Sequence, residues 1–241
     1  MRTVLLLGGT GEARKLATAL VGHVRVISSL AGRIKEPRLP PGEVRIGGFG
    51  GPDGFRQWIL DHGIDAVVDA THPFAARITQ TAATVTRELG IPFLVLRRPG
   101  WTQQSGDDWR WVGNTAEAAR SLKEDRVFLT TGREELNEFA HLGNWFLVRS
   151  VEPPGPPTPR RMHVILDRGP FTVDNEKRLL VEHSINVLVT KDSGGDMTAA
   201  KLTAARELHI PVVIIRRPAL PDVEKVADVE AVVRWLGIGG G

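Results

Sequence analysis

The chain of 241 residues contains no cysteine and no tyrosine. The absence of cysteine excludes disulfide bonds, thiolate nucleophiles and thiolate metal sites. The absence of tyrosine excludes phenol proton donors, including the tyrosine of the tyrosine–lysine pair that many short-chain dehydrogenases use. No run of roughly 18 apolar residues occurs, and a strand-like segment begins almost at Met1. We therefore expect a soluble, cytoplasmic protein without a signal peptide or a membrane contact.

The excess of positive over negative charge is also small, because 31 basic residues nearly balance 28 acidic ones and leave a net charge of +3. This excess is too small to indicate nucleic-acid binding. The basic residues come in pairs, such as Arg97-Arg98 and Arg216-Arg217. Such spacing suits separate anionic groups better than a phosphate backbone.

Strand-like and helix-like segments alternate from the start of the chain. The continuous apolar run at residues 4–7 is typical of a buried parallel strand, and apolar residues then recur at helical spacing over residues 12–21. Further segments continue the pattern, with strands predicted at residues 24–27, 43–46 and 66–70 and a helix at residues 55–62. This alternation predicts an α/β fold with parallel strands and helical crossovers.

An internal repeat is the strongest sign of organisation. Residues 71–99 align without a gap on residues 190–218, and both copies end in Arg-Arg-Pro. In addition, residues 127–132 open the later half much as residues 4–9 open the earlier one. We interpret the chain as two topologically similar halves.

The repeat predicts two Rossmann-like parallel-sheet domains, residues 1–110 and residues 111–241. The boundary is approximate, and a strand exchanged between the halves would change it. Ligands of open α/β sheets bind at the carboxyl ends of the strands, so we expect the active-site cleft between the two domains.

A glycine-rich turn stands between the first strand and the first helix. Here Gly9, Thr10, Gly11 and Glu12 are the candidates to bind a dinucleotide pyrophosphate, because glycines allow close approach and a helix N-terminus attracts anions. The match to G-x-G-x-x-G is imperfect, since Arg14 occupies the third glycine position. A simple tight turn is the alternative.

The end of the second strand discriminates between cofactors. NAD enzymes usually carry Asp or Glu there for the ribose 2′-hydroxyl. This chain instead offers Ser28, Ser29 and the nearby Arg33. Hydroxyls and a guanidinium suit a 2′-phosphate, so NADPH is favoured over NADH.

Two later loops of the first half supply further cofactor candidates. Five glycines crowd residues 47–54, and Gly50 and Gly51 are predicted to approach the ligand closely, although a flexible loop is the alternative. Thr71 and His72 follow the fourth strand, where the nicotinamide end of a dinucleotide would lie. A lone histidine is as readily structural as catalytic.

The second half places basic residues at its predicted strand ends. Lys191, Ser193 and Gly194 lie in the repeat's counterpart of the His72 segment, and these positions suit a substrate carboxylate. Further candidate anchors are Arg133, Arg149, Lys201 and Arg216. The proline-rich residues 152–159 predict an extended, exposed loop, either a passive connector or a cationic lid.

Together these segments resemble the precorrin-6A reductase family. The resemblance rests on Leu7-Gly8-Gly9-Thr10-Gly11-Glu12-Ala13, Ser29-Leu30-Ala31-Gly32-Arg33, Asp69-Ala70-Thr71-His72-Pro73-Phe74-Ala75, Thr130-Thr131-Gly132-Arg133, Ile165-Leu166-Asp167-Arg168-Gly169-Pro170-Phe171 and Lys191-Asp192-Ser193-Gly194-Gly195. Each segment is weak alone, and the six in this order are specific.

The resemblance implies NADPH in the first domain, a tetrapyrrole in the second, and hydride transfer to a macrocycle double bond that converts precorrin-6A to precorrin-6B in cobalamin biosynthesis. It adds Arg168 to the candidate carboxylate anchors. The proton donor stays open among His72, Asp192, another carboxyl group and water. No metal is expected, and a transient contact with the next enzyme of the pathway is an open question.

Three alternatives remain at this point. The substrate is either metal-free or the cobalt-precorrin-6A of the anaerobic route, and no residue decides between them. A non-catalytic NADPH-binding sensor would need no anionic substrate site, which the basic residues of the second half disfavour. A sugar-nucleotide transferase is disfavoured because the glycine turn and the 2′-phosphate signals fall together in the first half.

Overall fold

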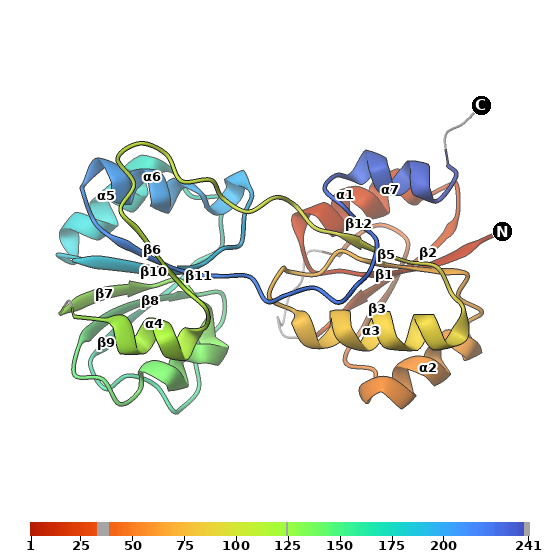
Figure 1. The fold of residues 1–241 in the computed structure, drawn as a ribbon, viewed down its shortest axis with the longest axis horizontal. Coiled ribbons are helices and arrows are strands. Elements are labelled where there is room, and N and C mark those ends of the chain that lie inside the picture. Colours follow the sequence, from red (N-terminus) through yellow and green to blue (C-terminus); the bar gives the residue numbers. More distant parts are fainter. Residues whose placement is uncertain (33–38, 124, 239–241) are drawn as a thin grey trace. The chain divides into compact units, whose positions relative to one another are not determined.

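The computed structural model describes residues 1–32, 39–123 and 125–238, and it divides the chain into two compact units. Unit 1 comprises Met1–Pro99 and Pro218–Gly241, and unit 2 comprises Gly100–Arg217. Each unit contains a six-stranded sheet in which every pairing is parallel (Figure 1). The expected class of two α/β parallel-sheet folds is confirmed.

Unit 1 has the strand order β12-β5-β4-β1-β2-β3, which is the order of a doubly wound Rossmann sheet. Its elements are β1 (Thr3–Leu7), α1 (Gly11–Leu20), β2 (Arg25–Leu30), β3 (Glu43–Ile46), α2 (Gly51–Asp61), β4 (Ala66–Asp69), α3 (Ala76–Leu89), β5 (Phe93–Leu96), β12 (Lys225–Val226) and α7 (Val229–Trp235).

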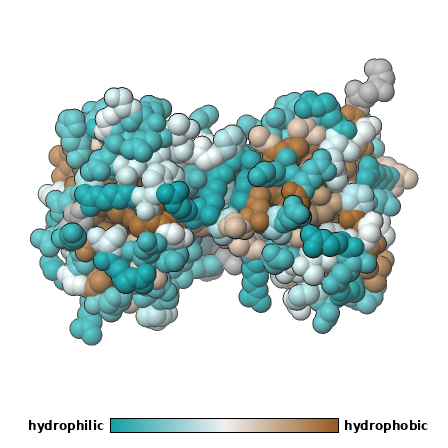
Figure 2. Space-filling view, viewed as in Figure 1, coloured by the Kyte–Doolittle hydropathy of each residue, from teal (hydrophilic) through white to brown (hydrophobic). Residues whose placement is uncertain are grey.

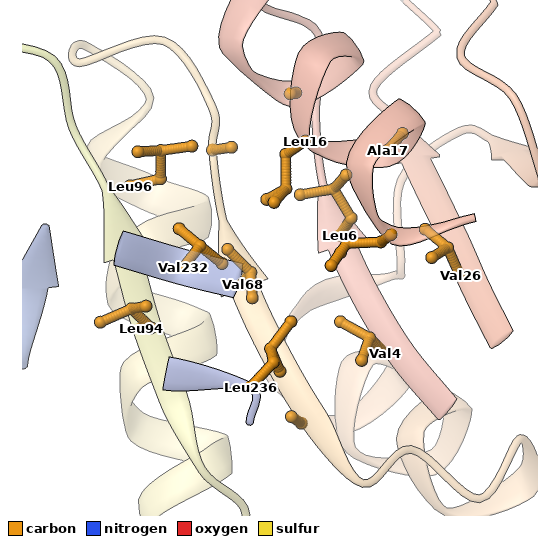
Figure 3. Close-up of a cluster of buried hydrophobic side chains, with 14 of the residues drawn as sticks. Val4, Leu6, Leu16, Ala17, Val26, Val68, Leu94, Leu96, Val232 and Leu236 are labelled. Carbon is orange, nitrogen blue, oxygen red and sulfur yellow. The ribbon is translucent and has the colours of Figure 1, made fainter. Parts of the chain in front are cut away.

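Helices cover both faces of this sheet because the strand side chains alternate between them. On one face Leu6 and Val68 pack with Leu16 of α1 and with Val232 and Leu236 around α7 (Figure 3). On the other face the strand side chains pack with residues of α2 and α3, among them Phe55, Ile59, Ala82 and Val85. The core of unit 1 therefore includes residues from the far end of the chain.

Unit 2 repeats this architecture with the order β6-β11-β10-β7-β8-β9. Its elements are β6 (Trp109–Val112), α4 (Thr115–Ser121), β7 (Arg126–Leu129), the 3₁₀ helix η1 (Arg133–Phe139), β8 (Trp145–Ser150), β9 (Met162–Leu166), α5 (Val173–Glu182), β10 (Val187–Lys191), the 3₁₀ helix η2 (Asp196–Thr198), α6 (Ala200–Glu207) and β11 (Val212–Ile215). Figure 1 shows α5 and α6 on one face of the sheet and α4 on the other.

The two units differ after their central strand. Unit 1 continues from β1 into α1, a helix of ten residues, whereas unit 2 continues from β7 into the seven-residue η1. A short 3₁₀ helix aligns fewer peptide dipoles than an α-helix. The partial positive charge at a helix N-terminus, which attracts a pyrophosphate, is therefore larger after the central strand of unit 1.

The units exchange their sixth strands, and this differs from the expected division into residues 1–110 and 111–241. After β5 the chain enters unit 2, where β6 pairs with β11, and after β11 it returns to unit 1, where β12 pairs with β5. The expected boundary would cut through β6. Sequence periodicity shows which segments are strands, but it does not show which neighbour each strand chooses.

None of the helices within the described residues is long and apolar enough to cross a membrane. Hydrophilic side chains predominate on the face drawn in Figure 2. Large aromatic side chains such as Phe55, Phe128 and Phe146 are fully buried.

We predict that Leu236→Ala destabilises unit 1. Leu236 is buried against the core that includes Leu6 and Val68, so truncation should lower the free energy of unfolding by about 2–5 kcal/mol. Denaturant unfolding measures this change, with Leu60→Ala as control, because exposed Leu60 should cost less than about 0.5 kcal/mol. Amide hydrogen exchange should accelerate in β1 and β4. An acceleration in β7 and β10 instead would contradict the placement of the C-terminal segment in unit 1.

Candidate functional site

The carboxyl edge of the sheet in unit 1 gathers three loops that are distant in the sequence. In the parallel register Leu7 lies beside both Ser29 and Asp69, so the segments after β1, β2 and β4 leave the sheet together. The amide of Gly8 donates to the carbonyl of Ser29 at 2.9 Å, and Thr10 Oγ1 donates to the carbonyl of Ala70 at 2.7 Å. One backbone bond and one side-chain bond thus tie the three loops together.

The glycine turn in this edge has the geometry of an anion-binding turn. Gly9 is exposed with a φ of +111°, which a residue with a side chain rarely adopts. Apart from its two chain neighbours, no described residue has a heavy atom within 4 Å of where its Cβ would stand. Thr10 caps α1, because its Oγ1 accepts from the amide of Ala13 at 3.1 Å. The open space at Gly9 and the start of α1 at Gly11 fit a pyrophosphate.

Glu12 belongs to the same turn but carries a negative charge. Its carboxylate forms an ion pair with Arg98 Nη1 at 2.6 Å. The pair neutralises Glu12 and holds a guanidinium beside the turn. Sequence analysis did not place Arg98 in the site, although the repeated Arg-Arg-Pro was a signal that could have found it.

The end of β2 presents the two predicted serines in different surroundings. Ser28 is 1% exposed, and no partner within the described residues reaches its Oγ. Ser29 Oγ accepts from Arg45 Nη1 at 2.7 Å. Arg33, the predicted partner of a 2′-phosphate, lies outside the described residues.

Gly50 and Gly51 lie at the start of α2. Gly50 is the N-cap of this helix with a φ of +82°, and no side chain caps the helix there. Within the described residues, no hydrogen bond joins Gly50 or Gly51 to the turn at Gly9. Asp53, in the first turn of α2, is fully exposed near Arg56.

Thr71 and His72 lie in a turn that the buried Asp69 holds. One carboxylate oxygen of Asp69 accepts from the amide of Thr71 at 2.9 Å and from its hydroxyl at 2.6 Å, and the other accepts from Thr79 Oγ1 at 2.6 Å. The amide of Phe74 donates to His72 Nδ1 at 3.3 Å. Since Nδ1 accepts, the proton of a neutral His72 ring sits on Nε2.

The corresponding turn of unit 2 contains Lys191 and Asp192. Lys191 Nζ forms an ion pair with Glu135 at 2.6 Å. Asp192 is buried, with Oδ1 accepting from the amide of Trp101 at 3.1 Å and Oδ2 lying 3.1 Å from Arg217 Nε. Both oxygens of Asp192 are engaged, so this side chain anchors the turn. Sequence analysis missed Arg217.

The remaining polar groups of this edge come from the turn after β7. Thr131 is buried, and within the described residues its Oγ1 has no hydrogen-bond partner. Arg133 is half-buried at the start of η1, Gly194 is buried, and the amide of Ser193 donates to the carbonyl of Lys191 at 2.7 Å. These groups share one edge because β7 and β10 are neighbours in the sheet.

Arg149 and Lys201 are buried rather than presented to solvent. Arg149 bonds both carboxylate oxygens of Glu176, one of them at 3.1 Å, and its guanidinium stacks 3.7 Å from the ring of Phe171. Lys201 Nζ donates to the carbonyl of Thr198 at 2.7 Å. Burial, followed by repulsion from Arg149, lowers the pKa of Lys201 to about 7, although Glu176 opposes the shift.

The other predicted anchors are exposed. Arg216 stacks on Trp111 with 4.9 Å from its guanidinium carbon to the ring centre, and Arg168 follows β9. The proline-rich residues 152–159 form an irregular segment between β8 and β9, mostly exposed, as expected. No group of three metal-ligating side chains occurs in the part of the chain that the structure describes.

These features define a class. The protein is a two-unit α/β protein of doubly wound parallel sheets, with a dinucleotide-type glycine turn in one unit and basic strand ends in the other. Residues 3–237 match the family described as "Precorrin-6x reductase CbiJ/CobK", and the chain belongs to this reductase family.

Individual relatives agree with the family match. A precorrin-6A reductase of Rhodococcus erythropolis is 52% identical over 243 residues, covering 98% of each chain. One of Mycobacterium tuberculosis is 50% identical over 238 residues, again covering 98% of each. The solved structure of a CobK precorrin-6A reductase is 39% identical, with a TM-score of 0.92 over 98% of this chain and 96% of that one.

We predict that Asp69→Asn weakens unit 1. An amide at this position offers one acceptor oxygen where three donors now bond a carboxylate, so the free energy of unfolding should fall by about 1–3 kcal/mol. Thermal or denaturant unfolding measures the loss. The exposed Asp53→Asn should change stability by less than about 0.5 kcal/mol, and equal effects of the two would contradict the role of Asp69.

We also predict that Lys201 makes stability depend on pH. Below its folded pKa of about 7 the lysine is charged in both states, and its burial destabilises the fold in full. At higher pH the folded state loses this proton while the unfolded chain keeps it, so stability rises by up to about 1.4 kcal/mol per pH unit.

The measurement compares denaturant unfolding of the wild type and Lys201→Met between about pH 6 and about pH 9. The advantage of the methionine variant should shrink as pH rises. Lys177→Met is the control, because Glu207 raises the pKa of Lys177 and both states stay protonated in this range. Parallel curves for the wild type and Lys201→Met would contradict the prediction.

Proposed function

We propose that this protein reduces a double bond of the precorrin-6A macrocycle with NADPH to give precorrin-6B, in the cytoplasm, as a step of cobalamin biosynthesis. The observation that carries the cofactor part is the open, left-handed turn at Gly9, placed at the capped start of α1 in a sheet of Rossmann order. Membership of the reductase family carries the substrate part.

The cofactor residues of this proposal lie in unit 1. Gly9, Thr10, Gly11 and Glu12 form the pyrophosphate turn, with the charge of Glu12 balanced by Arg98. Ser28, Ser29 and Arg33 serve the adenosine ribose and its 2′-phosphate. Thr71 and His72 serve the nicotinamide end, and Gly50 and Gly51 complete the set predicted from the sequence.

The substrate residues of this proposal lie in unit 2. A tetrapyrrole with many carboxylates needs several cations at separate positions, and the exposed or half-buried ones are Arg133, Arg168, Lys191 and Arg216. Ser193 and Gly194 shape the turn beside Lys191. Arg149 and Lys201 are assigned a supporting role, because both are buried and Arg149 is already paired with Glu176.

NADPH supplies a hydride when it is bound, and the protein's part is to position the reactants and to manage a proton. His72 is the proton donor that we propose, because its ring stays half-buried at the edge that carries the turn. Asp192 is the weaker candidate, since Arg217 and the amide of Trp101 already engage its carboxylate. Water is the remaining donor.

The test is NADPH oxidation by the purified protein with metal-free precorrin-6A, followed by the absorbance of NADPH. We expect turnover with NADPH and much less with NADH. Arg33→Ala should weaken NADPH use roughly 10- to 100-fold if its charge-assisted bonds to the 2′-phosphate contribute about 1.5–3 kcal/mol.

Other outcomes separate the alternatives. Turnover of cobalt-precorrin-6A alone would assign the protein to the anaerobic route. Tight NADPH binding without turnover of either substrate would indicate a sensor. A nucleotide sugar bound in place of NADPH would indicate a transferase. Co-purification with the enzyme that consumes the product would test the transient contact.

A further inference from the structure

Arg45 is a cation with an unusual set of partners. It lies on β3 directly beside Ser29 of β2, and its side chain is half-buried. Its Nη1 donates to Ser29 Oγ at 2.7 Å and to the carbonyl of Gly47 at 3.0 Å, and its Nη2 donates to the carbonyl of Gly48 at 3.0 Å. All three partners are neutral oxygens.

The charge of Arg45 is therefore not balanced within the described residues. Arg25, on the neighbouring strand, bonds the carboxylate of Glu43 at 2.7 Å, and Arg98 bonds Glu12 at 2.6 Å. Among the described residues no carboxylate pairs with Arg45 in this way, and burial lowers the pKa of its guanidinium. A partly desolvated cation that lacks a counter-ion favours an anion from outside the chain.

The guanidinium is also held in a fixed orientation. Its central carbon lies 3.8 Å from the centre of the Phe49 ring and 5.4 Å from that of Trp58. Three of its five N–H groups are used by Ser29, Gly47 and Gly48, which leaves two as donors. A pre-oriented guanidinium with two available donors suits two oxygens of one phosphate.

The position of Arg45 identifies the phosphate. Ser29 connects Arg45 to the glycine turn. Its carbonyl accepts from the amide of Gly8 in that turn, and its hydroxyl accepts from Arg45. In Rossmann sheets the adenosine ribose lies at the end of the second strand, about 20 residues after the glycine turn, which is where Ser29 stands. We propose that Arg45, positioned by Ser29 and Phe49, binds the 2′-phosphate and determines the preference for NADPH over NADH. This inference rests on the proposed cofactor.

The test measures binding of NADP⁺ and NAD⁺ to the wild type and to Arg45→Gln by calorimetry, without substrate. Glutamine removes the charge and the fork of donors, so NADP⁺ should bind about 10- to 100-fold more weakly, while NAD⁺ affinity changes little. Adenosine 2′,5′-bisphosphate and adenosine 5′-phosphate should show the same difference. Arg45→Lys, which keeps the charge but not the fork, should lose less.

Arg25→Gln is the matched control, because it removes an exposed guanidinium from the opposite end of β2 and should leave the ratio of affinities unchanged. Equal weakening of NADP⁺ binding and NAD⁺ binding in both Arg45 variants would overturn the inference. It would show that Arg45 only stabilises the loop after β3. A preference that survives Arg45→Gln but falls in Arg33→Gln would overturn it in favour of Arg33. A wild type that binds neither dinucleotide would instead refute the proposed cofactor.

Discussion

Parallel pairing is the constraint on which the rest of this structure depends. All strands of a parallel sheet end at the same edge, so β1, β2 and β4 deliver Gly8, Leu30 and Ala70 to one place, although Gly8 and Ala70 are 62 residues apart in the sequence. Backbone bonds between these loops then fix their spacing. The chemistry proposed for unit 1 needs an exposed turn, a capped helix start and hydroxyls close together, and this edge supplies all three.

The two units show one architecture with two different sets of side chains at the same edge. Unit 1 holds its fourth-strand turn with the buried carboxylate of Asp69, which bonds Thr71 and Thr79. Unit 2 holds the corresponding turn with Asp192, which bonds Trp101 and Arg217. Each unit buries an acid beneath this edge, but only unit 1 combines it with an α-helix after the central strand. The same scaffold thus presents a capped α-helix start in unit 1 and basic strand ends in unit 2, which is the division that the proposed function requires.

Much of this fold could be predicted from local sequence. Apolar runs and helical spacing gave the strands and helices of the first half, and the repeat indicated a second copy. An exchanged strand was foreseen as a possibility, but the sequence did not show that β6 and β12 are the strands exchanged, because only tertiary packing decides which sheet edge each strand joins. Arg45 was missed for a related reason: it stands in β3, and only the register of β3 against β2 brings it to Ser29. Arg149 shows a second limit of the sequence, since a basic residue at a strand end can be paired internally, here with Glu176.

The exchanged strands also affect how the chain folds as it is synthesised. Unit 2 is continuous from Gly100 to Arg217, so every one of its strands is synthesised before β12 and α7. Unit 1 begins first but depends on β12 and α7, whose Val232 and Leu236 pack with α1 on one face of its sheet. Until residues after Pro218 have been added, the outer edge of β5 is unpaired and part of this apolar face stays uncovered, so unit 1 cannot be completed before unit 2 has been synthesised.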